Sequence, residues 1–149
     1  MKIITIILAL GAFAGTTLAA KKLELKDLPA PVQKAAAENL KGGKITNIAK
    51  EKENGITQYE FDTTLDGKTR AFNVDSKGTL LVVEEEASID SFPAAAKAAI
   101  LKKVGDGKLG LVETFQKPGQ ELMYEAGWTT KGGKKMEILV KADGSVAKI

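Results

Sequence analysis

The chain has 149 residues, with 22 lysines and arginines against 19 aspartates and glutamates, and it contains no histidine and no cysteine. A chain of this size can build one adequate hydrophobic core without disulfides. The missing residue types remove the commonest acid–base catalyst, the thiolate nucleophile and the ordinary zinc ligand sets. The formal net charge is only +3, and one arginine with no basic cluster among aromatic residues argues against nucleic-acid binding.

The beginning of the chain has the pattern of an export signal. Lys2 supplies a positive start, an apolar run follows from Ile3 to Phe13, and Thr17-Leu18-Ala19 places small residues where a signal peptidase cleaves. A membrane anchor is the alternative, but the run is shorter than the roughly 20 residues that span a bilayer. We therefore predict a signal peptide over 1–19 and a mature protein in the periplasm or outside the cell, without a stable membrane anchor.

The remainder of the chain carries the same pattern twice. Three pairs of segments show this, at separations of 64, 65 and 66 residues: Leu28-Pro29-Ala30 and Phe92-Pro93-Ala94, Tyr59-Glu60 and Tyr124-Glu125, Gly67-Lys68 and Gly133-Lys134. The separation grows by one residue at two turns, as single-residue loop insertions in a duplicated fold would produce. We divide the mature chain into repeat 1 (20–86) and repeat 2 (87–149).

Each repeat is predicted to begin with a helix and to continue with strands. Asp27 and Ser91 are good N-caps at equivalent positions, each followed by a proline two residues later. Apolar residues then recur at helical spacing, and glycines end both helices: Ala35, Ala36 and Leu40, then Ala99, Ile100 and Val104. Four extended segments follow in each repeat: 44–53, 56–65, 68–75 and 79–86, then 108–117, 120–130, 134–142 and 145–149.

The central hairpin of each repeat has a predictable register. Asp66-Gly67 is a favoured two-residue turn, and counting back from it sets Phe61 opposite Phe72 and Tyr59 opposite Val74 on one face. A three-residue loop, 131–133, keeps the equivalent register in repeat 2: Tyr124 opposite Val140, Ala126 opposite Ile138, and Trp128 opposite Met136. We predict an α+β fold of two tandem repeats, each with one helix and a four-stranded antiparallel sheet, whose sheets join or abut and whose helices cover one face.

Repeat 1 also carries a recognisable series of turn and core residues: Gly43-Lys44-Ile45, Glu51-x-Glu53-x-Gly55, Tyr59-Glu60, Asp66-Gly67-Lys68 and Phe72-x-Val74-Asp75. This series resembles the PepSY-like, β-lactamase-inhibitor-like family of exported bacterial proteins. The resemblance covers nearly the whole mature chain in two copies, although in repeat 2 Lys141 replaces Asp75. It implies a tandem helix-then-antiparallel-sheet fold and a non-catalytic, inhibitor-like or ligand-binding role outside the cytoplasm, with no catalytic residues to transfer.

Three motif-like segments are better explained by structure. Ser145-Val146-Ala147-Lys148 matches S-x-x-K, but on a strand its two reactive side chains would point to opposite faces. The segment 62–67 resembles half a calcium loop without its central acidic ligand, which favours a hairpin turn. The run 84–86 of three glutamates is interpreted as a solvated strand end before a linker, with a cation or a basic partner as the alternative. We therefore predict no catalytic, cofactor or metal site.

The helix-free sheet face is the predicted interaction surface. In repeat 1 it is polar, whereas in repeat 2 Met123 and Leu139 form an apolar diagonal pair, which indicates either partner contact or packing between the repeats. Charged neighbours would form a polar rim, and Trp128 either closes the end of the core or anchors a partner. The predicted protein-binding residues are Gln58, Glu60, Met123, Glu125, Trp128, Glu137, Leu139 and Lys141.

The sequence thus predicts a non-enzymatic exported binding protein, an inhibitor or modulator of another extracytoplasmic protein, with no cofactor and no nucleic-acid partner. The alternative is a small-ligand or ion-sensing periplasmic module, which should keep a polar pocket between the repeats or show metal-dependent melting.

Overall fold

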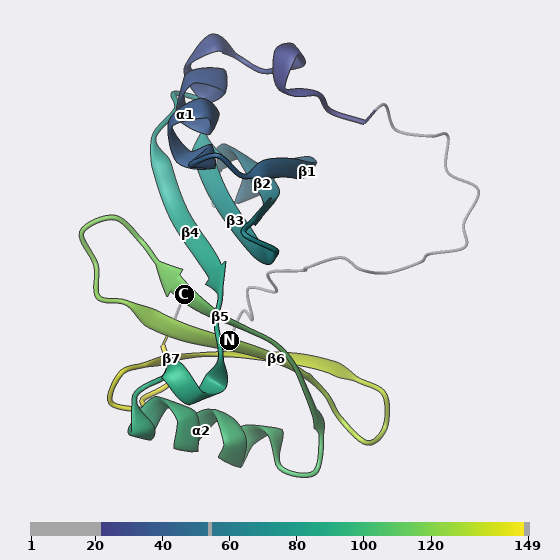
Figure 1. Cartoon of the computed structure of the whole chain (residues 1–149), viewed down its shortest axis with the longest axis vertical. Coiled ribbons are helices and arrows are strands. Elements are labelled where there is room, and N and C mark those ends of the chain that lie inside the picture. Colours follow the sequence, from purple (N-terminus) through teal and green to yellow (C-terminus); the bar gives the residue numbers. More distant parts are fainter. Residues whose placement is uncertain (1–21, 54, 148–149) are drawn as a thin grey trace.

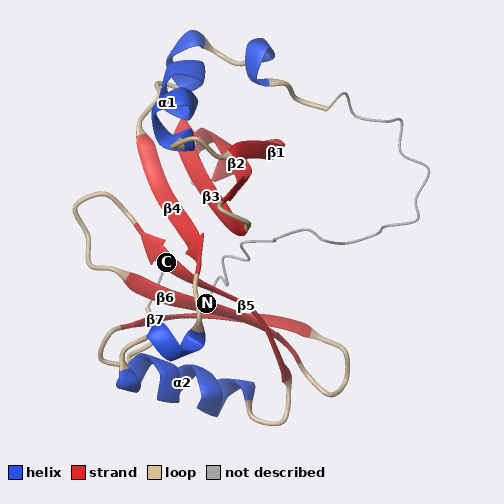
Figure 2. Cartoon of the chain, viewed as in Figure 1, coloured by secondary structure: helices blue, strands red, loops and turns tan. Residues whose placement is uncertain are grey.

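A computed structural model describes residues 22–53 and 55–147, and the predicted signal peptide lies outside this part of the chain. Within it, seven antiparallel strands form one sheet in chain order (Figures 1 and 2). The strands are β1 (Lys44–Glu53), β2 (Ile56–Leu65), β3 (Lys68–Asp75), β4 (Leu80–Glu86), β5 (Lys108–Gln116), β6 (Met123–Thr129) and β7 (Lys135–Lys141). The helices are α1 (Ala30–Leu40) and α2 (Ala94–Val104), each preceded by a short 3₁₀ helix, η1 (Leu25–Asp27) or η2 (Ile89–Ser91).

The fold is therefore α+β, as predicted, but the described part of repeat 2 has three strands rather than four. After β7 the chain makes only an isolated bridge, between Val140 and Val146. Val146 is 60% exposed. Little apolar surface is therefore buried here to stabilise a longer strand pairing. The last two residues of the predicted eighth strand, 148–149, lie outside the described residues.

The predicted register of both central hairpins is confirmed. Leu65 pairs with Lys68, and Asp66 and Gly67 between them have φ of 52° and 80°, as a two-residue hairpin turn with positive φ requires. Phe61 lies opposite Phe72, and their rings stack with centroids 4.9 Å apart. In repeat 2, Trp128 lies opposite Met136, as predicted.

Each repeat encloses its own hydrophobic core between one helix and its part of the sheet. Core 1 packs Val32 and Ala36 of α1 against Phe61, Phe72 and Val74. Core 2 packs the inner face of α2 in the same way against repeat 2: Ala96 and Ile100 of the helix against Ala126, Trp128 and Val140. Because strand residues alternate between faces, filling both cores places both helices on one face of the sheet.

The helices begin later than predicted. Asp27 and Ser91 end the 3₁₀ helices, and the N-cap positions of α1 and α2 are occupied by Pro29 and Pro93, neither of which makes a side-chain cap. Both prolines have extended ψ, 143° and 142°, so the α-helix starts only at the residue after each. The two predicted N-caps are therefore wrong, because a separate 3₁₀ turn intervenes.

The two repeats join through a direct strand pairing. Glu86 of β4 lies opposite Glu113 of β5, and Glu84 lies opposite Phe115. The glutamate run is the end of β4, as predicted, and Glu85 is exposed; β4 lies in the middle of the sheet, however, and the expected solvation is wrong for Glu84, which is 6% exposed. Figure 1 shows α1 and α2 at opposite ends of the molecule with the strands between them. The helix-free faces of the two repeats consequently turn toward each other.

Candidate functional site: an acidic hollow between the repeats

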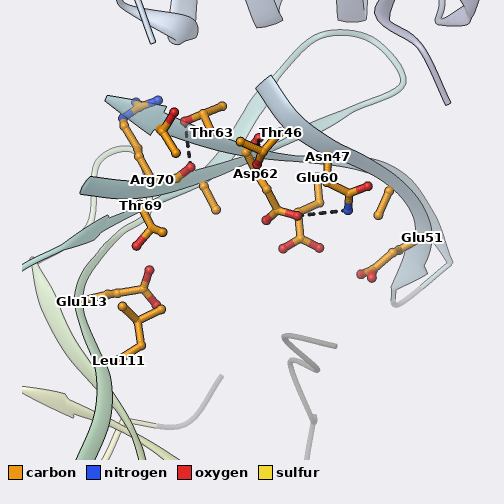
Figure 3. A pocket seen from close by; sticks show the side chains of 13 residues that line it. Thr46, Asn47, Glu51, Glu60, Asp62, Thr63, Thr69, Arg70, Leu111 and Glu113 are labelled. Carbon is orange, nitrogen blue, oxygen red and sulfur yellow. Dashed lines mark hydrogen bonds between the residues drawn. The ribbon is translucent and has the colours of Figure 1, made fainter. Parts of the chain in front are cut away.

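A hollow of about 580 Å³ lies on the helix-free side of the sheet and is lined by both repeats. One wall comes from β1, β2 and β3, and the facing wall comes from β5 through Leu111 and Glu113 (Figure 3). Its lining combines carboxylates, hydroxyls and small or apolar side chains: Glu51, Glu60, Asp62 and Glu113, then Thr46, Thr64 and Thr69, then Ala49, Ala71 and Leu111.

The carboxylates gather here because the strand register places them on one face. Residues directly opposite each other in antiparallel strands point to the same side, and Glu86, Glu113 and Glu125 lie opposite one another on three neighbouring strands. Glu60 and Asp62 are two residues apart on β2 and share that face. We call the whole set the acidic face: Glu51, Glu60, Asp62, Glu84, Glu86, Glu113, Glu125 and Glu137.

Several of these carboxyl groups are deeply buried, and burial raises their pKa. Glu84 and Glu113 are each 6% exposed. The pKa of Glu84 is raised to about 7, first by burial and then by the charges of Glu113 and Glu137. The pKa of Glu113 is also raised to about 7, by burial and then by nearby carboxylates beginning with Glu86. Both groups therefore resist ionisation until a cation or a higher pH favours it.

The same effect extends to both sides of this pair. Burial followed by the charge of Asp62 raises the pKa of Glu60 to about 7. Burial followed by the charge of Glu84 raises the pKa of Glu125 to about 8, and partial burial of its carboxyl group raises the pKa of Glu137, although the residue as a whole is exposed. One oxygen of Glu125, Oε2, is buried without a hydrogen-bond partner. The acidic face thus contains several carboxyl groups that remain partly protonated near neutral pH and become negative as the pH rises above 7 to 8.

No ion pair compensates the acidic face within residues 22–53 and 55–147. The arginine near the hollow, Arg70, points to the other side of the sheet, where its Nη1 donates to the carbonyl of Asn39 at 2.7 Å and its Nε to Glu85 at 2.9 Å. The carboxylate of Asp62 accepts a hydrogen bond from Asn47 at 3.0 Å, and that of Glu86 accepts two from Thr69 at 2.8 Å.

The acidic face does not form a compact metal site. No group of three or more acidic, histidine or cysteine side chains in the described residues is arranged to hold a metal ion. Of the half calcium loop at 62–67, residues 62–65 belong to strand β2 and Asp66-Gly67 forms the hairpin turn, since Leu65 pairs directly with Lys68. Among these residues there is also no helix with the length and apolar character needed to cross a membrane.

The predicted site residues divide between the two faces of the sheet. Trp128 is 8% exposed and belongs to core 2, so it closes the core and does not lie on the helix-free face. Leu139 is on the helix-free face but only 5% exposed, and Met123 is half-buried. Leu139 thus offers almost no exposed surface and Met123 offers part of its side chain, and contact of this pair with a partner stays a prediction.

The remaining predicted residues lie on the helix-free face. Glu60 and Glu125 are half-buried, Glu137 and Lys141 are exposed, and Gln58 is buried at 7%. The most buried carboxyl groups of the acidic face are Glu84 and Glu113; a basic partner for the run 84–86 was only the alternative interpretation, and Glu113 was not predicted. In the sequence, each of these glutamates follows a valine, Val83 or Val112, and this alternation is typical of a strand. The alternation alone does not place the two glutamates on one face, because that depends on the pairing of β4 with β5.

Comparisons with known proteins identify the fold. No protein-family model matches the sequence, and no curated protein matches it either. Three solved structures with the same fold are a protein described as periplasmic from Bacteroides eggerthii, a DUF2874 family protein from Bacteroides ovatus and a BLIP-like protein from Bacteroides fragilis.

The similarity to these structures is in the fold and not in close sequence relationship. The B. eggerthii protein is 19% identical with a TM-score of 0.65, and the match covers 81% of this chain and 86% of that one. The B. ovatus protein is 14% identical with a TM-score of 0.61, and the match covers 81% of this chain and 85% of that one. The B. fragilis protein is 19% identical with a TM-score of 0.57, and the match covers 81% of this chain and 84% of that one. The chain therefore has the fold of DUF2874 and BLIP-like proteins.

Proposed function

We propose that this protein is a non-enzymatic binding protein of the periplasm and that its helix-free sheet face is the interaction surface. The observation that carries this proposal is the acidic hollow of about 580 Å³, to which both repeats contribute. A duplicated fold with one helix-covered face leaves the opposite face for recognition. Buried carboxyl groups without an opposite charge are costly for stability, and such groups are expected where they serve binding.

The location and the kind of activity rest on the sequence and the fold together. The predicted signal peptide over 1–19 directs export, and a protein of the same fold is described as periplasmic. The chain contains no histidine and no cysteine, which removes the commonest catalytic groups. The BLIP-like fold of the B. fragilis protein supports an inhibitor or modulator of another extracytoplasmic protein.

Site-specific photo-crosslinking in the periplasm tests this proposal. A photo-reactive residue in place of Glu60 or Met123, on the helix-free face, is expected to form adducts with a specific protein. The same residue in place of Glu38 on α1 or Lys102 on α2, both exposed on the helices, serves as the control. Adducts that form equally from the helix positions, or from no position on the sheet face, would contradict the proposed interaction surface.

A small-ligand module is the second candidate, and the size of the hollow favours it. Small-molecule sites typically occupy about 300–1,000 Å³ and combine apolar walls with a few polar groups, and the hollow has about 580 Å³ with such a lining. Native mass spectrometry of protein purified from the periplasm distinguishes the two. A bound small molecule together with no protein adduct from the sheet face would favour this second function.

A further inference from the structure

We propose that the acidic face recognises an extended polypeptide segment of the partner protein that carries lysine or arginine side chains. This inference rests on the proposed function and adds the chemistry of the partner. It begins from the separation of charge in the molecule. The chain has a formal net charge of +3, yet eight carboxyl groups share the helix-free face, and none of them forms an ion pair among the described residues.

The lysines within the strands of this face lie at the strand ends, and Lys117, which follows β5, places its Nζ 5.6 Å from the centroid of the Phe115 ring, opposite Glu84. Lys44 begins β1, Lys108 begins β5, and Lys135 and Lys141 begin and end β7. All four are exposed. The centre of the face is consequently negative and its border positive, and a cationic segment is drawn to the centre rather than to the border.

The buried carboxyl group of Glu113 points to an occupant of the hollow. It lines the hollow and is directed toward the wall formed by β2 and β3 (Figure 3). Glu113 is 6% exposed, no hydrogen bond or ion pair joins it to another described residue, and directly opposite it on β6 the Oε2 of Glu125 is buried without a hydrogen-bond partner. A buried carboxylate normally has a partner, so the ammonium or guanidinium group of a ligand is the chemical group that this site lacks.

The rest of the lining suits a long cationic side chain better than a bare metal ion. Lysine and arginine combine an apolar stem with a charged end, and the hollow offers Leu111, Ala49 and Ala71 beside its carboxylates. Threonine hydroxyls at its edge can accept the remaining N–H groups. A metal ion instead needs several ligands at one point, and the described residues contain no such group.

The spacing of the carboxyl groups favours an extended segment over a small amine. Glu60 and Asp62 on β2, and Glu84 and Glu86 on β4, are each two residues apart on one face. Side chains on one face of any extended chain repeat at about 7 Å, so alternate cationic residues of a peptide match this separation. Glu125 and Glu137 extend the negative surface beyond the lining of the hollow, which a segment of several residues can follow.

Fluorescence anisotropy with a labelled eight-residue peptide of alternating lysine and threonine tests the inference. The protein is purified from the periplasm and measured at pH 8, and a peptide with glutamine in place of lysine is the reference. The triple variant Glu60→Gln, Glu84→Gln, Glu113→Gln is expected to bind the lysine peptide at least about tenfold more weakly. Circular dichroism establishes that the variant is folded.

A matched triple variant controls for net charge: Glu24→Gln, Glu38→Gln and Glu121→Gln change the charge equally at exposed positions away from the acidic face. Its affinity for the lysine peptide is expected to stay within about twofold. Equal weakening in both variants would overturn the inference, because binding would then follow net charge alone. Spermidine or calcium that displaces the peptide at an equal concentration of charge would also overturn it in favour of a small-cation site.

The outcome is separable from that of the proposed function. Photo-crosslinking does not depend on the charge of the partner. Adducts from the sheet face together with equal binding of the lysine and glutamine peptides would refute the cationic segment and leave the interaction surface intact. Selective peptide binding without any adduct from the sheet face would support the cationic site and contradict a periplasmic protein partner.

Discussion

Replacing Glu84 by glutamine is expected to raise the free energy of unfolding at pH 8 by about 3 kcal/mol. Glu84 is 6% exposed, and its pKa is raised from 4.5 to about 7, first by burial and then by Glu113 and Glu137. One pH unit of difference between the folded and unfolded pKa corresponds to about 1.4 kcal/mol, which gives about 3 kcal/mol for this group. Glutamine keeps the shape of the side chain and removes the charge.

The sign of the effect follows from the direction of the pKa change. The unfolded chain ionises Glu84 near 4.5, whereas the folded protein holds its proton until about pH 7. A raised pKa contributes stability that is fully present below the unfolded pKa and is lost as the pH rises through the folded pKa. The advantage of the glutamine variant therefore grows between about pH 4.5 and pH 7 and is then constant.

Urea unfolding between pH 4.5 and pH 9 measures this advantage. Trp128 provides a fluorescence signal from core 2, where it is 8% exposed, and far-ultraviolet circular dichroism follows the whole fold. The control is Glu121→Gln, an exposed position in the connection between β5 and β6, which should change stability by less than about 0.5 kcal/mol at every pH. A gain for Glu84→Gln that is the same at pH 4.5 and pH 8, or absent at pH 8, would refute the reasoning.

Three further substitutions test other parts of the structure by urea unfolding. Gly78→Ala should destabilise the protein by more than about 1 kcal/mol, because φ is +83° and an added Cβ would lie 2.5 Å from a carbonyl oxygen in the first turn of α1. The control Gly67→Ala, with φ +80° and open space around the added Cβ, should cost less stability, and equal costs for the two variants would contradict the clash. Arg70→Met should cost about 1–3 kcal/mol, because the carbonyl of Asn39 loses its 2.7 Å hydrogen bond; an unchanged urea midpoint would show that this contact is dispensable. Trp128→Ala should cost about 3–5 kcal/mol as a core truncation, and full stability with impaired adduct formation would instead restore it as a partner anchor.

The elements that were predicted best are those governed by local chemistry. The hairpin register depends on Asp66-Gly67 and on the alternation of apolar residues beside it, both within about ten residues of the turn. The three-residue loop of repeat 2 keeps the same alternation, with the Thr130 N–H donating to the Lys134 carbonyl at 2.8 Å. The turn after β7 is stabilised by a different residue from the equivalent turn of repeat 1. Repeat 2 has Lys141 in place of Asp75, and there the carboxylate of Asp143 accepts a hydrogen bond from the Ser145 N–H at 2.8 Å.

The helix starts were missed because two local signals compete there. Asp27 and Ser91 have the side chains of N-caps, but Leu28 and Phe92 after them are extended and buried at 6% in the two cores. Burial of these residues separates the 3₁₀ turn from the α-helix that follows. Tertiary packing thus overrides the capping preference at both positions.

The sequence by itself determined the repeat, the first seven strands, the two helices and the side of each hairpin that forms a core, because turns and alternation act over short distances. Only the tertiary structure decided that β4 pairs with β5. The connection between those strands contains η2 and α2, so no short turn specifies its register, and burial of both cores settles it. That pairing turns a run of apparently solvated glutamates into the middle of the acidic face and sets Glu113 across the hollow from β2 and β3.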